Sequence, residues 1–372
     1  MMNYLMCSVG RRGELMKNFR QSMSKGSRII ATDNSPYAPA LYFADKQYLV
    51  PLITASNYID TLLDICKREK INAITTFIDP EIMLLAENRE RFTEIGVEVL
   101  APYTETAKLC FNKYEMFKHL RNKGIRTPAT WGSWEEVEQA IKNGECSLPV
   151  FVKPRTGSGS VGARKITDIE TLRTAFKFEP SLIAQELMTG EGQFDLDADI
   201  YVDTVTHKPV SIFTKRKLST TIGGANKTIS FKDDKLFAFI EGALQHFKFN
   251  GPIDADFFYK DGEYYLSEVN PRFGGAYLHA YGAGVDFIKL IDRNLAGHAN
   301  EPQIGNYDDG VVMMMYDSVV IGRKRTTGNN KDNNNNNDQL LEIITPPPNC
   351  VEPLLTLGRH SMLFALVMST IS

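Results

Sequence analysis

The chain has 372 residues and a formal net charge of −3, from 42 basic and 45 acidic residues. A near-neutral chain lacks the basic face that nucleic-acid binding requires, so we expect no nucleic-acid partner. With 43% hydrophobic and 23% charged residues, the composition is that of a globular protein, which excludes disorder throughout the chain. The length is sufficient for two or three domains.

The five cysteines and six histidines are scattered along the sequence. They form no CxxC pair and no HExxH motif, so we predict neither disulfides nor a zinc site. An apolar run over residues 4–9 is followed by arginines, the reverse of the order in a signal peptide. The apolar run at 362–368 is far shorter than the roughly 20 residues that cross a bilayer. We therefore expect a cytoplasmic protein that does not associate with membranes.

The first hundred residues alternate between short apolar runs and amphipathic stretches. We predict strands at about residues 4–9, 28–31, 48–50 and 73–77, and helices at about 14–23, 58–68 and 81–92. Strands separated by helices of this length are typical of βαβ units, which form a parallel sheet. The sequence therefore predicts an N-terminal α/β domain.

The next two hundred residues are richer in strands. After one or two helices over 104–123, we predict a helix at 233–246 and strands at 150–153, 163–166, 182–186, 194–202, 210–217, 253–259 and 263–269. The segment Lys260-Asp261-Gly262 lies between two apolar runs, and Asp-Gly in that setting is a strong hairpin signal. This part of the chain is predicted to be α+β with an antiparallel sheet.

The C-terminal segment differs from the rest of the sequence. From Thr326 the chain is polar, with an unbroken asparagine run at 333–337 and three prolines at 346–348. A packed core cannot be built from such a composition, so we expect residues 326–372 to be a disordered, low-complexity tail.

The glycine-rich segment Gly157–Gly162 matches the pattern GxGxxG. A dinucleotide-binding motif needs a helix after these glycines, but residues 163–166 have the pattern of a returning strand. A Walker A motif needs GK[ST], which is missing here. A hairpin without a ligand is one alternative. Lys153 favours a hairpin that binds an anion, because burying a lysine in apolar surroundings costs free energy unless an anion neutralises it. Backbone N–H groups of a glycine hairpin can bind that anion, a phosphate.

A second group of polar residues lies at the predicted hairpin. Glu268 and Asn270 are two residues apart and so face the same side of a strand, and Asp256 of the partner strand can face Glu268. Two carboxylates and an amide oxygen suit Mg²⁺ that bridges phosphates. Arg272 adds a planar group that can bind a phosphate. An ordinary solvated strand face is the alternative.

With these motifs in place, the sequence resembles the ATP-grasp superfamily, and within it the carbamoyl-phosphate-synthase-like carboxylate–amine ligases. The resemblance rests on Phe151-Val152-Lys153-Pro154 with the glycine loop, on Ala184-Gln185-Glu186-Leu187, and on residues 268–275. It implies a pre-ATP-grasp domain over 1–103 and an ATP-grasp domain over 104–325. Within the latter, the lid is expected at about 125–188 and the metal-bearing part at about 189–325.

The resemblance also implies roles for individual residues. The nucleotide would be held by the two lysines Lys113 and Lys153, by the glycine loop (Gly157, Ser158, Gly159, Ser160), and by the hinge residues Gln185, Glu186 and Leu187. The acid that usually holds the ribose aligns with Gln193, and Glu191 lies two residues earlier, so both remain candidates. Asp256, Glu268 and Asn270 match the ligands of Mg²⁺ (or Mn²⁺). Arg272 matches the arginine beside the transferred phosphate, and Lys215 and Arg216 lie where the family often places a cation that faces the triphosphate or substrate.

The implied function is ATP-dependent activation of a small-molecule carboxylate as an acyl-phosphate, which an amine then attacks. Two alternatives remain open: a phosphotransferase on the same scaffold and a non-catalytic ATP-binding protein. For the substrates, His279 is a candidate to orient the nucleophile, although a packed histidine is an equal alternative. Arg11 or Arg12, at the end of the first strand, is a candidate to receive a carboxylate. A homodimer is one possible state of assembly.

Overall fold

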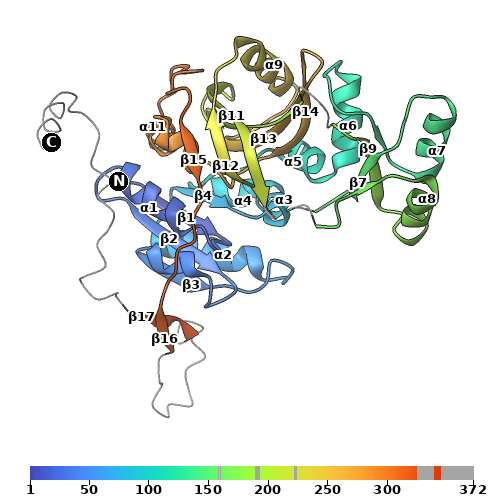
Figure 1. Cartoon of the computed structure of the whole chain (residues 1–372). Coiled ribbons are helices and arrows are strands. Elements are labelled where there is room, and N and C mark those ends of the chain that lie inside the picture. Colours follow the sequence, from blue (N-terminus) through green and yellow to red (C-terminus); the bar gives the residue numbers. More distant parts are fainter. Residues whose placement is uncertain (158, 160, 189–192, 222–223, 325–338, 345–372) are drawn as a thin grey trace, which may run out of the picture.

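The computed structural model describes residues 1–157, 159, 161–188, 193–221, 224–324 and 339–344. Its N-terminal part is a five-stranded parallel sheet in the order β3-β2-β1-β4-β5 (Figure 1). The strands are β1 Asn3–Cys7, β2 Arg28–Asp33, β3 Lys46–Leu49, β4 Ala73–Thr76 and β5 Glu98–Val99. The helices are α1 Gly13–Ser22, η1 Pro39–Phe43, α2 Tyr58–Glu69, α3 Asp79–Glu87 and α4 Arg89–Thr93. The α/β prediction is confirmed, except that the helix expected at 81–92 is divided at Asn88.

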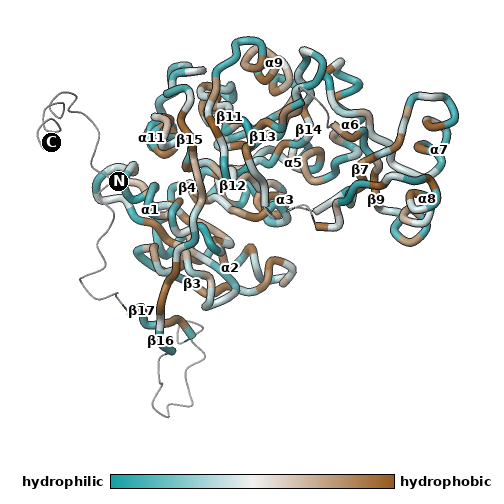
Figure 2. Tube along the Cα trace, in the orientation of Figure 1, coloured by the Kyte–Doolittle hydropathy of each residue, from teal (hydrophilic) through white to brown (hydrophobic). Residues whose placement is uncertain are grey.

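A small four-stranded antiparallel sheet follows, in the order β6-β9-β7-β8. Helices α5 Thr104–Phe111 and α6 Lys113–Asn122 precede it, and its strands are β6 Thr130–Trp131, β7 Val150–Pro154, β8 Arg164–Ile166 and β9 Leu182–Glu186. Helices α7 Trp134–Lys142 and α8 Ile169–Phe178, which the sequence analysis did not predict, pack their apolar sides on this sheet. Figure 2 shows apolar stretches in β7 and β9 and many hydrophilic positions on α7.

The central element is a six-stranded antiparallel sheet in the order β14-β13-β10-β11-β12-β15. Its strands are β10 Phe194–Val202, β11 Pro209–Thr221, β12 Gly224–Ser230, β13 Gly251–Lys260, β14 Glu263–Asn270 and β15 Val312–Met314. Three helices accompany it: α9 Asp234–Leu244, α10 Leu278–Gly282 and α11 Phe287–Leu295. The hairpin predicted at 260–262 joins β13 to β14, where Asp261 and Gly262 both have positive φ.

The six-stranded sheet has one apolar and one charged face, because successive side chains of a strand point to opposite sides. Along β10, Leu196, Ala198 and Ile200 belong to the same core as Leu236 and Ile240 of α9. Asp197 and Asp199 alternate with them and are buried on the other side. The charged face is therefore the side away from the α9 core.

The predicted tail lies largely outside the described residues, which include only 339–344 of it. Within that short piece, β17 Leu341–Ile343 pairs antiparallel with β16 Gly322–Lys324, a pairing that the sequence analysis did not predict. The Leu341 N–H donates to the Tyr42 hydroxyl of the N-terminal domain at 3.0 Å. No helix among the residues described here is long and apolar enough to cross a membrane.

Candidate functional site

The charged face of the six-stranded sheet brings the three predicted metal ligands together. Strand pairing places Asp256 opposite Glu268 and Asp254 opposite Asn270. Residues that pair directly across antiparallel strands face the same side. The adjoining strand β10 adds Asp197 opposite Asp256. The pairing predicted across the hairpin is thus confirmed, and the row includes three further carboxylates that the sequence analysis missed: Asp197, Asp199 and Asp254.

Two lysines from separate elements approach Glu268. The Lys113 Nζ atom lies 3.4 Å from one Glu268 carboxylate oxygen, and the Lys153 Nζ atom lies 4.0 Å from the other. Lys113 is the first residue of α6, whose start is fixed by the Asn112 side chain accepting hydrogen bonds from two backbone N–H groups. Burial lowers the pKa of Lys153, and the Glu268 carboxylate opposes this shift. The two lysines predicted to hold the nucleotide therefore converge on a predicted metal ligand.

The glycine loop connects two antiparallel strands, as its sequence context predicted. β7 pairs with β8, so the chain returns as a strand and does not open a helix. Gly157, Gly159 and Gly162 have φ values of 115°, 68° and 76°, which a residue with a side chain rarely adopts. The Gly157 carbonyl accepts a hydrogen bond of 2.7 Å from Lys113 Nζ, which ties the loop to the site. The predicted residues Ser158 and Ser160 lie outside the described residues.

The predicted hinge residues lie at the end of β9 and directly after it. The Gln185 side chain donates to Thr130 Oγ1 at 3.0 Å, so it is held within the small sheet. The Glu186 carboxylate forms an ion pair with Lys260 of β13, a residue that the sequence analysis did not select. Leu187 is half-buried directly after the strand. Of the two ribose candidates, Gln193 is half-buried with no partner for its side-chain oxygen among the described residues, and Glu191 is outside them.

Arg272 joins the charged face to the N-terminal domain. Its Nε atom donates to Asp79 Oδ1 at 2.7 Å, and its Nη1 atom lies 3.8 Å from Asp254 Oδ2. Burial alone would lower the pKa of Arg272, but these two carboxylates raise it above the usual value. Arg12 also reaches this junction and donates to the Gly274 carbonyl at 2.8 Å, while Arg11 is exposed. Burial lowers the pKa of Arg12 to about 10.

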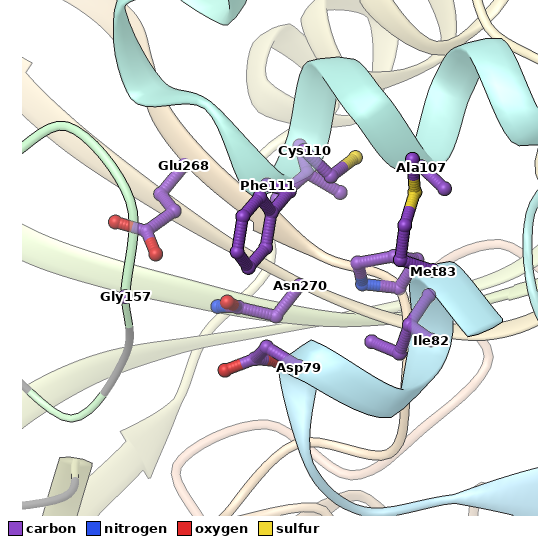
Figure 3. A pocket seen from close by; sticks show the side chains of 11 residues that line it. Asp79, Ile82, Met83, Ala107, Cys110, Phe111, Gly157, Glu268 and Asn270 are labelled. Atoms are coloured by element: carbon purple, nitrogen blue, oxygen red, sulfur yellow. The ribbon is translucent and has the colours of Figure 1, made fainter. Parts of the chain in front are cut away.

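A small cavity of about 20 Å³ opens where these elements meet (Figure 3). It is lined by Glu268 and Asn270 of β14 and by Gly157 of the glycine loop. Asp79 of α3 and Phe111 at the end of α5 also line it. The cavity thus lies among the N-terminal domain, the glycine loop and the charged sheet face.

The two cations predicted on β11 lie on opposite faces of the sheet. Lys215 is fully buried and contacts Asp197, at 3.3 Å, and Asp199. Arg216 lies on the other side, with its guanidinium 5.1 Å from the centre of the Phe194 ring, so the structure does not bring it to the site. Lys217, which the sequence analysis did not select, is on the charged face and forms an ion pair with Asp256.

His279 is packed and not directed into the cavity. Its two ring nitrogens lie 2.7 Å from Thr228 Oγ1 and 2.9 Å from the Val311 carbonyl. A carbonyl oxygen can only accept, so Nε2, which faces Val311, carries the proton. Nδ1 then accepts a hydrogen bond from the Thr228 hydroxyl. Burial lowers the pKa of His279 to about 4, and the nearby Lys215 contributes to the shift.

The oxygen donors on the charged face fit a hard divalent cation. Asp256 and Glu268 offer carboxylates and Asn270 offers an amide oxygen, all on adjoining strands, which is the donor chemistry that Mg²⁺ prefers. Within the described ranges no three His, Cys, Asp or Glu side chains group as a metal site, so the third donor would be the amide. Both carboxylates pair with lysines: Asp256 with Lys217 and Glu268 with Lys113.

Comparison with known families agrees with this geometry. Residues 4–100 match the PylC-like N-terminal domain, and residues 110–276 match the ATP-grasp domain. Residues 110–276 are thus an ATP-grasp domain, and a PylC-like N-terminal domain precedes it. ATP is the nucleotide that this family uses.

Several curated proteins are similar over part of the chain. A formate-dependent phosphoribosylglycinamide formyltransferase from Saccharolobus solfataricus is 25% identical over 171 residues, which cover 44% of this chain and 40% of that protein. A pyruvate carboxylase from Bacillus subtilis is 24% identical over 297 residues, which cover 71% of this chain and 25% of that protein. The chain thus spans less than half the length of these relatives.

Solved structures share the fold at low identity. N5-carboxyaminoimidazole synthetase from Staphylococcus aureus aligns with a TM-score of 0.64 and 17% identity, over 83% of this chain and 80% of that one. An L-amino acid ligase from Bacillus licheniformis aligns with a TM-score of 0.61 and 17% identity, over 81% of this chain and 75% of that one. The biotin carboxylase domain of 2-oxoglutarate carboxylase from Hydrogenobacter thermophilus was solved with MgADP. It aligns with a TM-score of 0.65 and 16% identity, over 84% of this chain and 73% of that one.

Proposed function

We propose that this protein is an ATP- and Mg²⁺-dependent ligase that activates a small-molecule carboxylate as an acyl-phosphate for attack by an amine. The observation that carries the proposal is the convergence of Lys113 and Lys153 on Glu268, beside Asn270 and at the edge of a cavity. Cations that face a carboxylate at a glycine hairpin are the arrangement that a metal-bound polyphosphate needs. The names of the relatives, several of them ligases or carboxylases, support the same reaction class.

In this proposal ATP lies between the lid, at about 125–188, and the metal-bearing part, at about 189–325. Lys113, Lys153 and the N–H groups of the glycine loop bind its phosphates. Glu186 and Leu187 read the adenine edge, and Gln193 or Glu191 holds the ribose. Mg²⁺ (or Mn²⁺), held by Asp256, Glu268 and Asn270, would neutralise charge on the phosphates.

The proposed reaction needs no protein nucleophile. A carboxylate oxygen of the substrate attacks the γ-phosphorus, the bond to the β-phosphate oxygen breaks, and ADP leaves. The amine nitrogen then attacks the acyl carbon, the carbon–oxygen bond to phosphate breaks, and the nitrogen loses a proton. Catalysis comes from positioning and from charge stabilisation.

Arg272 is the cation proposed to stabilise the transferred phosphate. It lies two residues beyond Asn270 and is held from behind by Asp79, so its guanidinium is already ordered before substrate binds. Lys215 is proposed as a positioning cation, because it is fully buried against Asp197 and Asp199 beneath the same face. Arg216 has no role in this reaction scheme. The proposal places the reaction in the cytoplasm and leaves a homodimer as the assembly to test.

The proposal is tested by ADP and phosphate release from the purified full-length chain with ATP and Mg²⁺, in the presence of pooled amino acids and small carboxylates. We expect release that depends on a pool and that disappears in Glu268→Ala. The mass of the product distinguishes a ligase, which joins two substrates, from a phosphotransferase, which leaves a stable phosphorylated product. Absence of ATP binding would refute the proposal.

A further inference from the structure

A second cavity lies on the opposite face of the six-stranded sheet from Glu268. Its volume is about 340 Å³, and it is bounded by β10, β11, β12, β13 and β14 and by the residue before α9. Figure 1 shows α9 above the strands β11 and β13. Its volume is in the range of small-molecule sites. The sheet itself separates it from the proposed ATP site.

Aromatic side chains form the walls of this second cavity. The rings of Phe194 and Tyr259 are stacked, with centroids 6.2 Å apart and an angle of 23° between their planes. Tyr264 continues the wall, with its ring centroid 4.9 Å from that of Tyr259. Phe231 also lines the cavity. Such walls suit a flat aromatic ring, which gains offset stacking in addition to burial.

Two charged side chains line this cavity, Asp233 and Arg216, and they differ in their hydrogen bonding. The Asp233 carboxylate is occupied on both oxygens: one caps α9 by accepting from the Lys235 N–H at 2.8 Å, and the other accepts from the Tyr264 hydroxyl at 2.5 Å. Arg216 is half-buried with its guanidinium over the Phe194 ring, and it has no ion pair or hydrogen bond among the residues that the structure describes. Among the described residues, the cavity therefore offers a planar cation, Arg216, without a polar partner.

We propose that this second cavity binds a planar aromatic anion, with its ring against Phe194 and Tyr259 and its carboxylate or similar group on Arg216. A guanidinium binds a carboxylate through two parallel hydrogen bonds, and its stacking on Phe194 holds it in a fixed orientation for that contact. The site does not overlap the ATP cleft, because Arg216 and Lys215 point to opposite faces of β11. It accounts for an arginine that the reaction scheme does not use.

Titration calorimetry of the full-length chain with 2-naphthoate tests this proposal. We expect one binding site, and Arg216→Gln should weaken binding at least about tenfold, the loss expected for a charge-assisted hydrogen bond. Phe194→Leu keeps the site apolar but removes the ring, and it should also weaken binding. The uncharged 2-naphthylmethanol should bind more weakly than 2-naphthoate and be insensitive to Arg216→Gln.

Arg173→Gln is the matched control, because Arg173 also lies over an aromatic ring, that of Trp134, but in the lid. It should leave 2-naphthoate binding unchanged, and far-UV circular dichroism should show that all variants are folded. Three results would overturn the proposal: no binding of 2-naphthoate to the unmodified chain, equal weakening in Arg173→Gln and Arg216→Gln, or displacement of 2-naphthoate by ATP and Mg²⁺. The last would place the ligand in the ATP cleft.

Discussion

Arg272 Nε donates a 2.7 Å hydrogen bond to Asp79 Oδ1, and this contact joins the end of β14 to the start of α3. Both side chains are largely buried, with 15% and 17% of their surface exposed, so the pair is shielded from solvent. The N-terminal domain therefore does more than cover the ATP-grasp domain. It fixes the orientation of the arginine proposed to act on the transferred phosphate.

Replacing the Asp79 partner should impair turnover without removing the arginine. Asp79→Asn loses the charge that orients Arg272, and we expect kcat to fall by about tenfold to a hundredfold, the scale at which a misplaced catalytic group costs rate. ATP affinity should change little, since Asp79 faces the arginine. Steady-state kinetics with the identified substrates measures both. Asp60→Asn is the control, because Asp60 pairs with Arg91 on the surface; an equal loss of kcat in both variants would refute the positioning role.

The two lysines at Glu268 should contribute to ATP affinity. Lys113→Ala and Lys153→Ala each remove a cation from the phosphates, and we expect the dissociation constant of ATP to rise about ten- to a hundredfold. Titration calorimetry with ATP and Mg²⁺ gives this value. Lys118→Ala is the control, because Lys118 lies on the same helix as Lys113 but pairs with Glu115 in solvent. The affinity of this variant for ATP should equal that of the unmodified chain. Unchanged affinity in the first two variants would remove the basis of the nucleotide site.

Gly274 should not tolerate a side chain. A Cβ at this position would lie 2.6 Å from Asp199 Oδ1 and 2.7 Å from Asp254 Oδ1, so Gly274→Ala must displace buried carboxylates. We expect a loss of about 1–3 kcal/mol in the free energy of unfolding, together with lower activity. Gly282→Ala is the matched control, because its Cβ would meet no atom within 4 Å. Denaturant unfolding compares the two, and equal stability would contradict the packing described here.

His279 should make the stability depend on pH. Its pKa is lowered from 6.5 to about 4 in the folded protein, so between these values the unfolded chain binds a proton that the folded chain does not. Stability due to this group is therefore complete above about pH 6.5 and is lost as the pH falls toward 4, by up to about 1.4 kcal/mol per pH unit.

Unfolding at several pH values compares the unmodified chain with His279→Gln, in which the slope between pH 4 and 6.5 should be smaller. A steeper slope in His279→Gln than in the unmodified chain would show that this histidine is not the group responsible.

Local sequence patterns predicted which strand residues of the site lie opposite each other better than they predicted which cations contact them. The Asp261-Gly262 turn and the two-residue alternation were sufficient to place Asp256 opposite Glu268, as the structure confirms. The same alternation means that Lys215 and Arg216 cannot share a face. The prediction that both lie where a cation faces the triphosphate or substrate ignored this alternation. The cation that does share the face of Lys215 is Lys217, two residues further along the strand.

The contacts between distant segments could not be read from periodicity. Asp79 meets Arg272 only because the N-terminal domain packs on the ATP-grasp domain. Lys260 meets Glu186 only because β13 and β9, which belong to different sheets, come together. Neither contact leaves a signal within a window of ten or twenty residues. The domain boundaries at 103, 188 and 325 remain predictions.

The central claim, carboxylate activation through an acyl-phosphate, is tested most directly by oxygen transfer. The full-length chain is supplied with ATP, Mg²⁺, an active amine and its carboxylate substrate labelled with ¹⁸O, and the released phosphate is analysed by mass spectrometry. The proposed reaction transfers one ¹⁸O from the carboxylate to each phosphate, and Glu268→Gln should abolish both release and transfer. Turnover that yields unlabelled phosphate would contradict the account, because the carboxylate would then not have attacked the γ-phosphorus.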